Sequence, residues 1–154
     1  MAKDEVTLRE VLEEDLPIFF EHQQEPEANR MADFPARARD AFMEHWRTKV
    51  LVNARGQKKT IVVGGRVVGN VVSWEQGGQR LVGYWVGRDH WGQGIATAAL
   101  REFLKHETTR PLHAHVVRHN LGSIRVLEKC GFRTVDDPPA DSVEPEEVLL
   151  RLDG

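Results

Sequence analysis

Residues 83–104, GYWVGRDHWGQGIATAALREFL, decide the fold of this 154-residue chain. The first part is apolar and aromatic, as in a buried strand, and the last part places Ile95 and Phe103 on one face of a helix. Between them, Gly92 and Gly94 indicate a tight turn. Such a turn exposes unpaired backbone amides, and the helix that follows presents the positive end of its dipole. The stretch therefore predicts a strand–turn–helix unit that can bind a phosphate or pyrophosphate.

Two common nucleotide-binding motifs do not fit this turn. The P-loop pattern GxxxxGK[ST] is absent from the sequence. The dinucleotide pattern GxGxxG would need glycine at position 97, where Thr97 stands. That pattern also belongs to an early strand–helix–strand unit, whereas three antiparallel strands are expected before this turn.

Upstream of the turn, the sequence predicts one strand and two helices. Alternating apolar residues indicate a strand at 6–11. Asp15 can cap a helix over 15–24, with Pro17 in its first turn. A second helix is expected over 35–52. Its apolar face would contain Phe42, Trp46 and Val50. The intervening segment, residues 25–34, is interpreted as a loop.

Glycine pairs at 64–65 and 77–78 predict two hairpin turns and hence an antiparallel meander. Its three strands would cover residues 58–63, 66–74 and 80–87. Downstream we expect a strand at 112–119, a short helix from 120 closed by Gly131, and strands from Phe132 and over 148–152. The predicted fold is one α+β domain, residues 1–154, with a mixed, mostly antiparallel sheet and helices on both faces.

The composition excludes several classes of protein. A net charge of −3 argues against broad nucleic-acid binding, and no apolar run is long enough to cross a membrane. The N-terminal residues are too acidic for a secretory signal, and a single cysteine, Cys130, fits a reducing cytoplasm. His113, His115 and His119 form HxHxxxH, but no further ligand accompanies them, so we predict no metal site.

Residues 83–104 resemble the acetyl-CoA-binding motif of the GNAT superfamily of N-acetyltransferases, [Q/R]-x-x-G-x-[G/A]. Gly94 and Ala96 match the last two fixed positions, while Trp91 replaces Gln or Arg. That departure is usual in the branch similar to the ribosomal-protein N-terminal acetyltransferases RimJ and RimL. The block from Asn120 to Phe132 resembles the downstream motif of the same branch.

The resemblance implies acetyl-CoA as co-substrate and assigns residues to it. The backbone of Val86 would pair with the amides of the pantetheine arm, and Asn120 would hydrogen bond that arm. The loop that would hold the pyrophosphate contains Gly92, Gln93, Gly94, Ala96 and Thr97.

The catalytic residues are harder to assign. Many members of the superfamily carry a tyrosine acid at the position of Leu127, which cannot donate a proton. The RimL-like branch suggests Ser123 for that role, although a serine at a helix start can also bond backbone amides. Glu75 is the nearest acid for a general base, because the position used by some relatives is Arg80 here. Tyr84 could line the acceptor site or pack in the core.

The expected function is acetyl transfer from acetyl-CoA to a primary amine, by direct attack in a ternary complex. The acceptor would be a protein N-terminus or a small-molecule amine, and a homodimer is possible. The alternative is a non-catalytic acyl-CoA-binding regulatory module. Glu25, Glu27 and Asp33 could attract a cationic amine or could simply be solvated surface acids.

Overall fold

The computed structural model describes residues 5–32, 37–52, 56–136 and 147–153. Within these residues, seven strands form one sheet in the order β1-β2-β3-β4-β5-β7-β6. Their bounds are Val6–Glu10 (β1), Lys58–Val63 (β2), Arg66–Gln76 (β3), Gln79–Val86 (β4), Leu112–Val117 (β5), Arg133–Asp136 (β6) and Glu147–Leu152 (β7). Neighbours are antiparallel except β4 and β5, which are parallel. The predicted mixed, mostly antiparallel sheet is confirmed.

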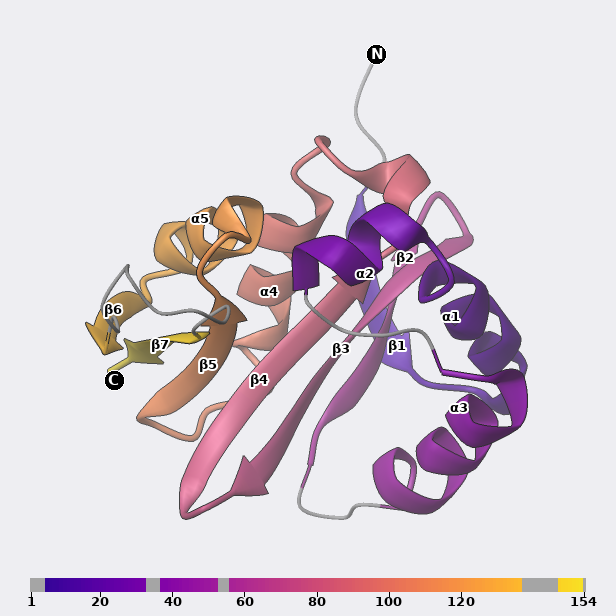
Figure 1. The fold of residues 1–154 in the computed structure, drawn as a ribbon, viewed down its shortest axis with the longest axis horizontal. Coiled ribbons are helices and arrows are strands. Elements are labelled where there is room, and N and C mark those ends of the chain that lie inside the picture. The colour runs from indigo at the N-terminus through magenta and orange to yellow at the C-terminus, as the bar shows by residue number, and fades with distance from the viewer. Residues whose placement is uncertain (1–4, 33–36, 53–55, 137–146, 154) are drawn as a thin grey trace.

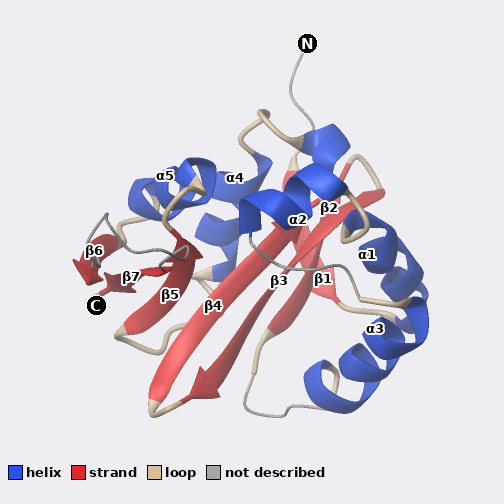
Figure 2. Ribbon diagram, in the orientation of Figure 1, coloured by secondary structure: helices blue, strands red, loops and turns tan. Residues whose placement is uncertain are grey.

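Helices cover both faces of the sheet, as predicted (Figures 1 and 2). Their bounds are Leu16–His22 (α1), Pro26–Ala32 (α2), Arg39–His45 (α3), Ile95–Phe103 (α4) and Leu121–Lys129 (α5). In Figure 1, α1, α2 and α3 lie toward the viewer, and α4 lies behind the sheet. Each face has its own apolar core, one built around Phe19, Phe42 and Trp46 and the other around Ile95, Ala99 and Phe103.

The region between β1 and β2 differs from the sequence prediction. Residues 26–32 form α2 rather than a loop, with Pro26 as the first residue, a position where its missing N–H costs nothing. The next helix begins at Arg39, and its end widens into a π turn over Trp46–Val50. The tight positive-φ turns predicted at Gly64–Gly65 and Gly77–Gly78 are present.

Asp15 does not cap α1 with its side chain, contrary to the prediction. Its buried carboxylate accepts hydrogen bonds from the Arg9 guanidinium at 2.7 and 2.9 Å, from the Leu12 amide at 2.8 Å and from the Thr60 hydroxyl at 2.7 Å. Burial alone would raise the pKa of Asp15, but these hydrogen bonds outweigh it and lower the pKa. The residue therefore ties β1 and β2 to the start of α1.

The feature of the sheet that creates a site is the junction of β4 and β5. Only one residue pair, Leu81 and His113, joins these strands in the described part of the chain, and it lies near the start of both. Beyond it the strands diverge toward the end that carries the glycine-rich turn (Figure 1). The sheet thus contains an internal gap.

Candidate active site

The turn between β4 and α4 leaves open space in front of its backbone. Gly92 and Gly94 have φ of 76° and 75°, in the left-handed region that favours glycine. A Cβ atom built on either would meet no atom within 4 Å. Gly94 is the N-cap of α4 and has no side chain with which to bond the first amides of that helix. Free amides, helix dipole and open space coincide here, as an anion site requires.

A cavity of about 480 Å³ lies in front of this turn, between the N-terminal ends of α4 and α5; we call it the α4–α5 cavity. Most of the predicted cofactor residues line it: Val86, Gly92, Gly94, Ala96, Thr97 and Asn120. Gln93 is not among the lining residues. Arg125 and Lys129 also line the cavity, and no carboxylate does so among the described residues. Its charge therefore suits an anionic ligand.

Trp91, which departs from the family motif, has a structural role in the turn. Its indole Nε1 donates a hydrogen bond of 2.9 Å to the carbonyl of Val86, the last residue of β4. The guanidinium of Arg88 lies 5.7 Å from the centre of the indole ring. The tryptophan thus fixes the glycine turn against the strand end that forms one wall of the cavity.

The start of α5 is capped by Asn120 and not by Ser123, a choice that the sequence left open. Asn120 is the N-cap, and its Oδ1 accepts a hydrogen bond of 3.3 Å from the Ser123 amide. Ser123 is therefore not the capping residue. The Asn120 amide nitrogen keeps its donor hydrogens available for another partner.

The Ser123 hydroxyl instead contacts Tyr84 on β4. The two oxygens are 2.6 Å apart, and the Tyr84 oxygen is also 3.3 Å from the Ser123 carbonyl. Burial raises the pKa of Tyr84 to about 12, and its hydrogen bond with Ser123 partly offsets that rise. The sequence placed Tyr84 on the correct strand but gave no signal for this contact, because the partner lies 39 residues away.

A second cavity, of about 540 Å³, occupies the gap where β4 and β5 diverge; we call it the β4–β5 cavity. Indole, amide, imidazole and carboxylate groups line it, from Trp74, Gln76, Trp85, His115 and Glu147. His115 Nδ1 is 3.6 Å from Glu147 Oε2. No lysine or arginine of the described segments lines this cavity. Its charge is thus opposite to that of the α4–α5 cavity.

The two cavities adjoin. Four residues line both of them: Tyr84, Trp85, Asn120 and Ser123. A ligand in one cavity can therefore approach a ligand in the other at the Tyr84–Ser123 contact. The sequence did not indicate His115 or Glu147 for this site, because their placement depends on the pairing of β5 with β7.

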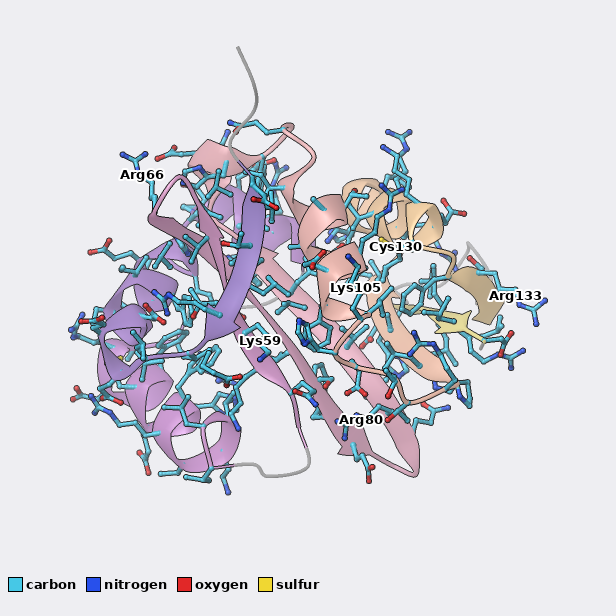
Figure 3. The ribbon with its side chains drawn as sticks, turned by 180° about the vertical axis from the view of Figure 1, so that it is seen from behind. Lys59, Arg66, Arg80, Lys105, Cys130 and Arg133 are labelled. Atoms are coloured by element: carbon cyan, nitrogen blue, oxygen red, sulfur yellow. The ribbon has the colours of Figure 1, made fainter. Side chains whose placement is uncertain are left out.

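The structure does not bring Glu75 to this meeting point. Its carboxylate lies 3.7 Å from Arg80 Nη1, and it is not a lining residue of either cavity. Its neighbours Trp74 and Gln76 line the β4–β5 cavity, so strand alternation directs Glu75 to the other face. Figure 3 shows Arg80 near the β3–β4 hairpin, away from the α5 end marked by Cys130. The position of Glu75 gives the predicted base role no support.

Two of the three acids proposed to attract a cationic amine form ion pairs with arginines instead. Glu25 pairs with Arg88 at 2.8 Å and Glu27 pairs with Arg30, while Asp33 lies outside the described residues.

No group of three or more potential metal ligands occurs in the described part of the chain, and no helix there could cross a membrane. Burial raises the pKa of the Cys130 thiol, as expected for an unreactive cysteine.

Comparison with known proteins identifies the family. Residues 5–133 match the model of the acetyltransferase (GNAT) domain. A 56-residue stretch is 44% identical to the probable N-acetyltransferase YjcK of Bacillus subtilis, and this match spans 34% of the present chain and 31% of that protein.

Two solved structures share the fold. One is a spermidine N-acetyltransferase chimera of Vibrio cholerae SpeG and hSSAT, with a TM-score of 0.80, 18% identity, and coverage of 96% of this chain and 95% of that one. The other is the ribosomal-protein acetyltransferase RimL in complex with coenzyme A, with a TM-score of 0.78, 17% identity, and coverage of 95% and 92%.

Proposed function

This chain belongs to the GNAT acetyltransferase family, and we propose that it transfers the acetyl group of acetyl-CoA to a primary amine within a ternary complex. Membership makes it an acyltransferase. The choice of a primary amine as acceptor and the roles of individual residues are our inference from the site.

The observation that carries the proposal is the pair of joined cavities. The α4–α5 cavity combines the glycine turn with Arg125 and Lys129 and suits the pyrophosphate end of acetyl-CoA. The β4–β5 cavity contains the carboxylate of Glu147 and no described lysine or arginine, and it suits a cationic amine. Because the cavities meet at Tyr84 and Ser123, the thioester and the amine would come together there.

The cofactor contacts follow from this placement. Gly92, Gly94, Ala96 and Thr97, with Gln93 in the same turn, would hold the pyrophosphate through backbone amides. Asn120 would donate its amide hydrogens to the pantetheine arm. The backbone of β4 near Val86 would bond the arm and polarise the thioester carbonyl.

The chemistry requires a neutral amine. Its nitrogen attacks the thioester carbon, the carbon–sulfur bond breaks, and the amide product loses the proton that the released thiol gains. A protein α-amine, with a pKa of about 7.7 to 8.0, is substantially neutral without a base, whereas a lysine-type amine is not. Since Glu75 lies away from the point where the cavities adjoin, we propose that the amine loses its proton to water or to a side chain that lines the β4–β5 cavity, His115 or Glu147.

The substrates of the two structural neighbours are consistent with a primary amine as the acceptor. One neighbour is a spermidine N-acetyltransferase and the other acetylates a ribosomal protein, and both substrates offer primary amines. For the present chain, Glu147 beside the aromatic walls of the β4–β5 cavity supports a cationic acceptor with an apolar portion.

An acceptor panel tests the proposal. Purified protein is incubated with acetyl-CoA and peptides with free N-termini, polyamines, aminoglycosides or amino acids, and the released thiol is measured. We expect amine-dependent thiol release with at least one class. Tight binding of acetyl-CoA without release for any amine would instead favour the non-catalytic acyl-CoA-binding module.

A further inference from the structure

The contact between Tyr84 and Ser123 has a direction that bears on the reaction. O–H···O hydrogen bonds in proteins span about 2.5 to 3.0 Å. The Tyr84 and Ser123 hydroxyl oxygens, 2.6 Å apart, lie in that range and either can be the donor, whereas the bond from Tyr84 to the Ser123 carbonyl, at 3.3 Å, is longer and weaker. A phenol is a stronger acid than an alcohol, so the phenol is the preferred donor. With the phenol as the donor of the shorter bond, Tyr84 donates to Ser123 Oγ.

In this arrangement the Ser123 hydroxyl hydrogen takes no part in the contact with Tyr84. The Ser123 amide is bonded to Asn120, and its hydroxyl oxygen already accepts from Tyr84. The residue lines both cavities, at their meeting point. Its hydroxyl hydrogen is thus free to point at a ligand atom placed there.

We infer that Tyr84 is a positioning residue, which holds the Ser123 hydroxyl so that its hydrogen is directed at the departing sulfur. The inference rests on the proposed acetyl transfer and names the group that assists its leaving step. When the carbon–sulfur bond breaks, the sulfur takes the electron pair and accepts the hydrogen bond from Ser123. The proton that finally neutralises the thiolate is the one lost by the attacking amine.

Tyr84 does not itself supply that proton. Its pKa is raised to about 12 by burial, whereas a thiol has a pKa of about 8.5, so proton transfer between them is unfavourable by roughly three orders of magnitude. Tyr84 remains a hydrogen-bond donor at every pH at which the enzyme would be assayed. It supplies through Ser123 the hydrogen bond that Leu127 cannot provide.

Kinetics of matched variants test the inference. We expect Ser123→Ala to lower kcat about tenfold and Tyr84→Phe about threefold, with the dissociation constant of acetyl-CoA and the acceptor KM nearly unchanged. The double variant should equal Ser123→Ala alone, because Tyr84 acts only through Ser123. Ser73→Ala removes a buried hydroxyl bonded to Glu107, outside both cavities, and is the control for lost stability.

A second measurement does not depend on activity. Tyr84 is the one tyrosine in the sequence, so growth on 3-fluorotyrosine places a single fluorine label beside Ser123. The fluorine resonance should move in Ser123→Ala and on addition of coenzyme A, and it should remain in place in Ser73→Ala.

The outcomes are distinguishable. An unchanged kcat in Tyr84→Phe, a larger loss in Tyr84→Phe than in Ser123→Ala, or multiplied losses in the double variant would each overturn the positioning role while acetyl transfer stands. A fluorine resonance that does not respond to Ser123→Ala would overturn the contact itself. No thiol release from the unaltered chain with any amine would overturn the proposed function, and this inference with it.

Discussion

The substitution Gly94→Val tests the binding of acetyl-CoA separately from a general loss of folding stability. Gly94 has a φ of 75°, and a Cβ atom there would meet no protein atom within 4 Å. The cost to the fold is therefore that of a left-handed residue, about 1 to 2 kcal/mol. The branched side chain would extend into the α4–α5 cavity, where backbone must approach the pyrophosphate. We expect affinity for acetyl-CoA to fall at least about tenfold, or roughly 1.4 kcal/mol.

Gly78 offers a matched control. Its φ is 79°, a Cβ atom there also meets nothing within 4 Å, and it lies in the β3–β4 hairpin outside both cavities. Gly78→Val should therefore lose a similar amount of stability without losing affinity. Thermal unfolding measures the stability of both variants, and isothermal calorimetry measures their binding of acetyl-CoA.

Two results would refute the reasoning. Unchanged affinity in a folded Gly94→Val variant would remove the glycine turn from the cofactor site. Equal losses of affinity in Gly94→Val and Gly78→Val would show that binding responds to general destabilisation rather than to the occupied cavity.

Three further predictions concern pH and the start of α5. The rate of acetyl transfer should rise with pH and level near the pKa of each acceptor amine, and a common apparent pKa of about 6 to 7 for chemically different amines would reveal a protein base instead. Asn120→Ala should chiefly raise the KM for acetyl-CoA, with kcat retained, and should cost about 1 kcal/mol of stability in denaturant unfolding because the α5 cap is lost. The pKa of Tyr84 is raised to about 12 in the folded state but is about 10 when unfolded, so the free energy of unfolding should fall by about 2 kcal/mol between pH 10 and pH 12. Unfolding of Tyr84→Phe across the same range, which should lack this loss, measures the effect.

Local patterns in the sequence were sufficient for most of the fold. The glycine pairs gave the hairpins, and the spacing of Ile95, Ala99 and Phe103 gave the buried face of α4. The helix at 26–32 was missed because Glu25, Glu27 and Arg30 carry no apolar periodicity, although Pro26 was a signal for a helix start. The helix instead buries the small side chain of Ala28 and makes polar contacts, including those of Glu27 with Arg30 and of Glu25 with the Glu27 amide.

The site was predictable only where its residues are close in the sequence. The glycine turn and the start of α5 each form from consecutive residues, and six of the seven predicted cofactor residues line one cavity. The contact of Tyr84 with Ser123 and that of His115 with Glu147 depend on how strands and helices are packed. The acid at Glu75 was chosen from its place near a strand end, but strand alternation directs it to the other face.

The divergence of β4 and β5 leaves two open strand edges inside the sheet. Unpaired backbone at a sheet edge is ordinarily a template on which another protein chain can add a strand, which leads to aggregation. Here α4 lies behind the gap, and α2 lies in front of the upper end of β4 (Figure 1). Because helices cover the faces of the sheet, a second sheet has restricted access to these edges. The helices that border the candidate site thus also protect the exposed edges from pairing with a second sheet.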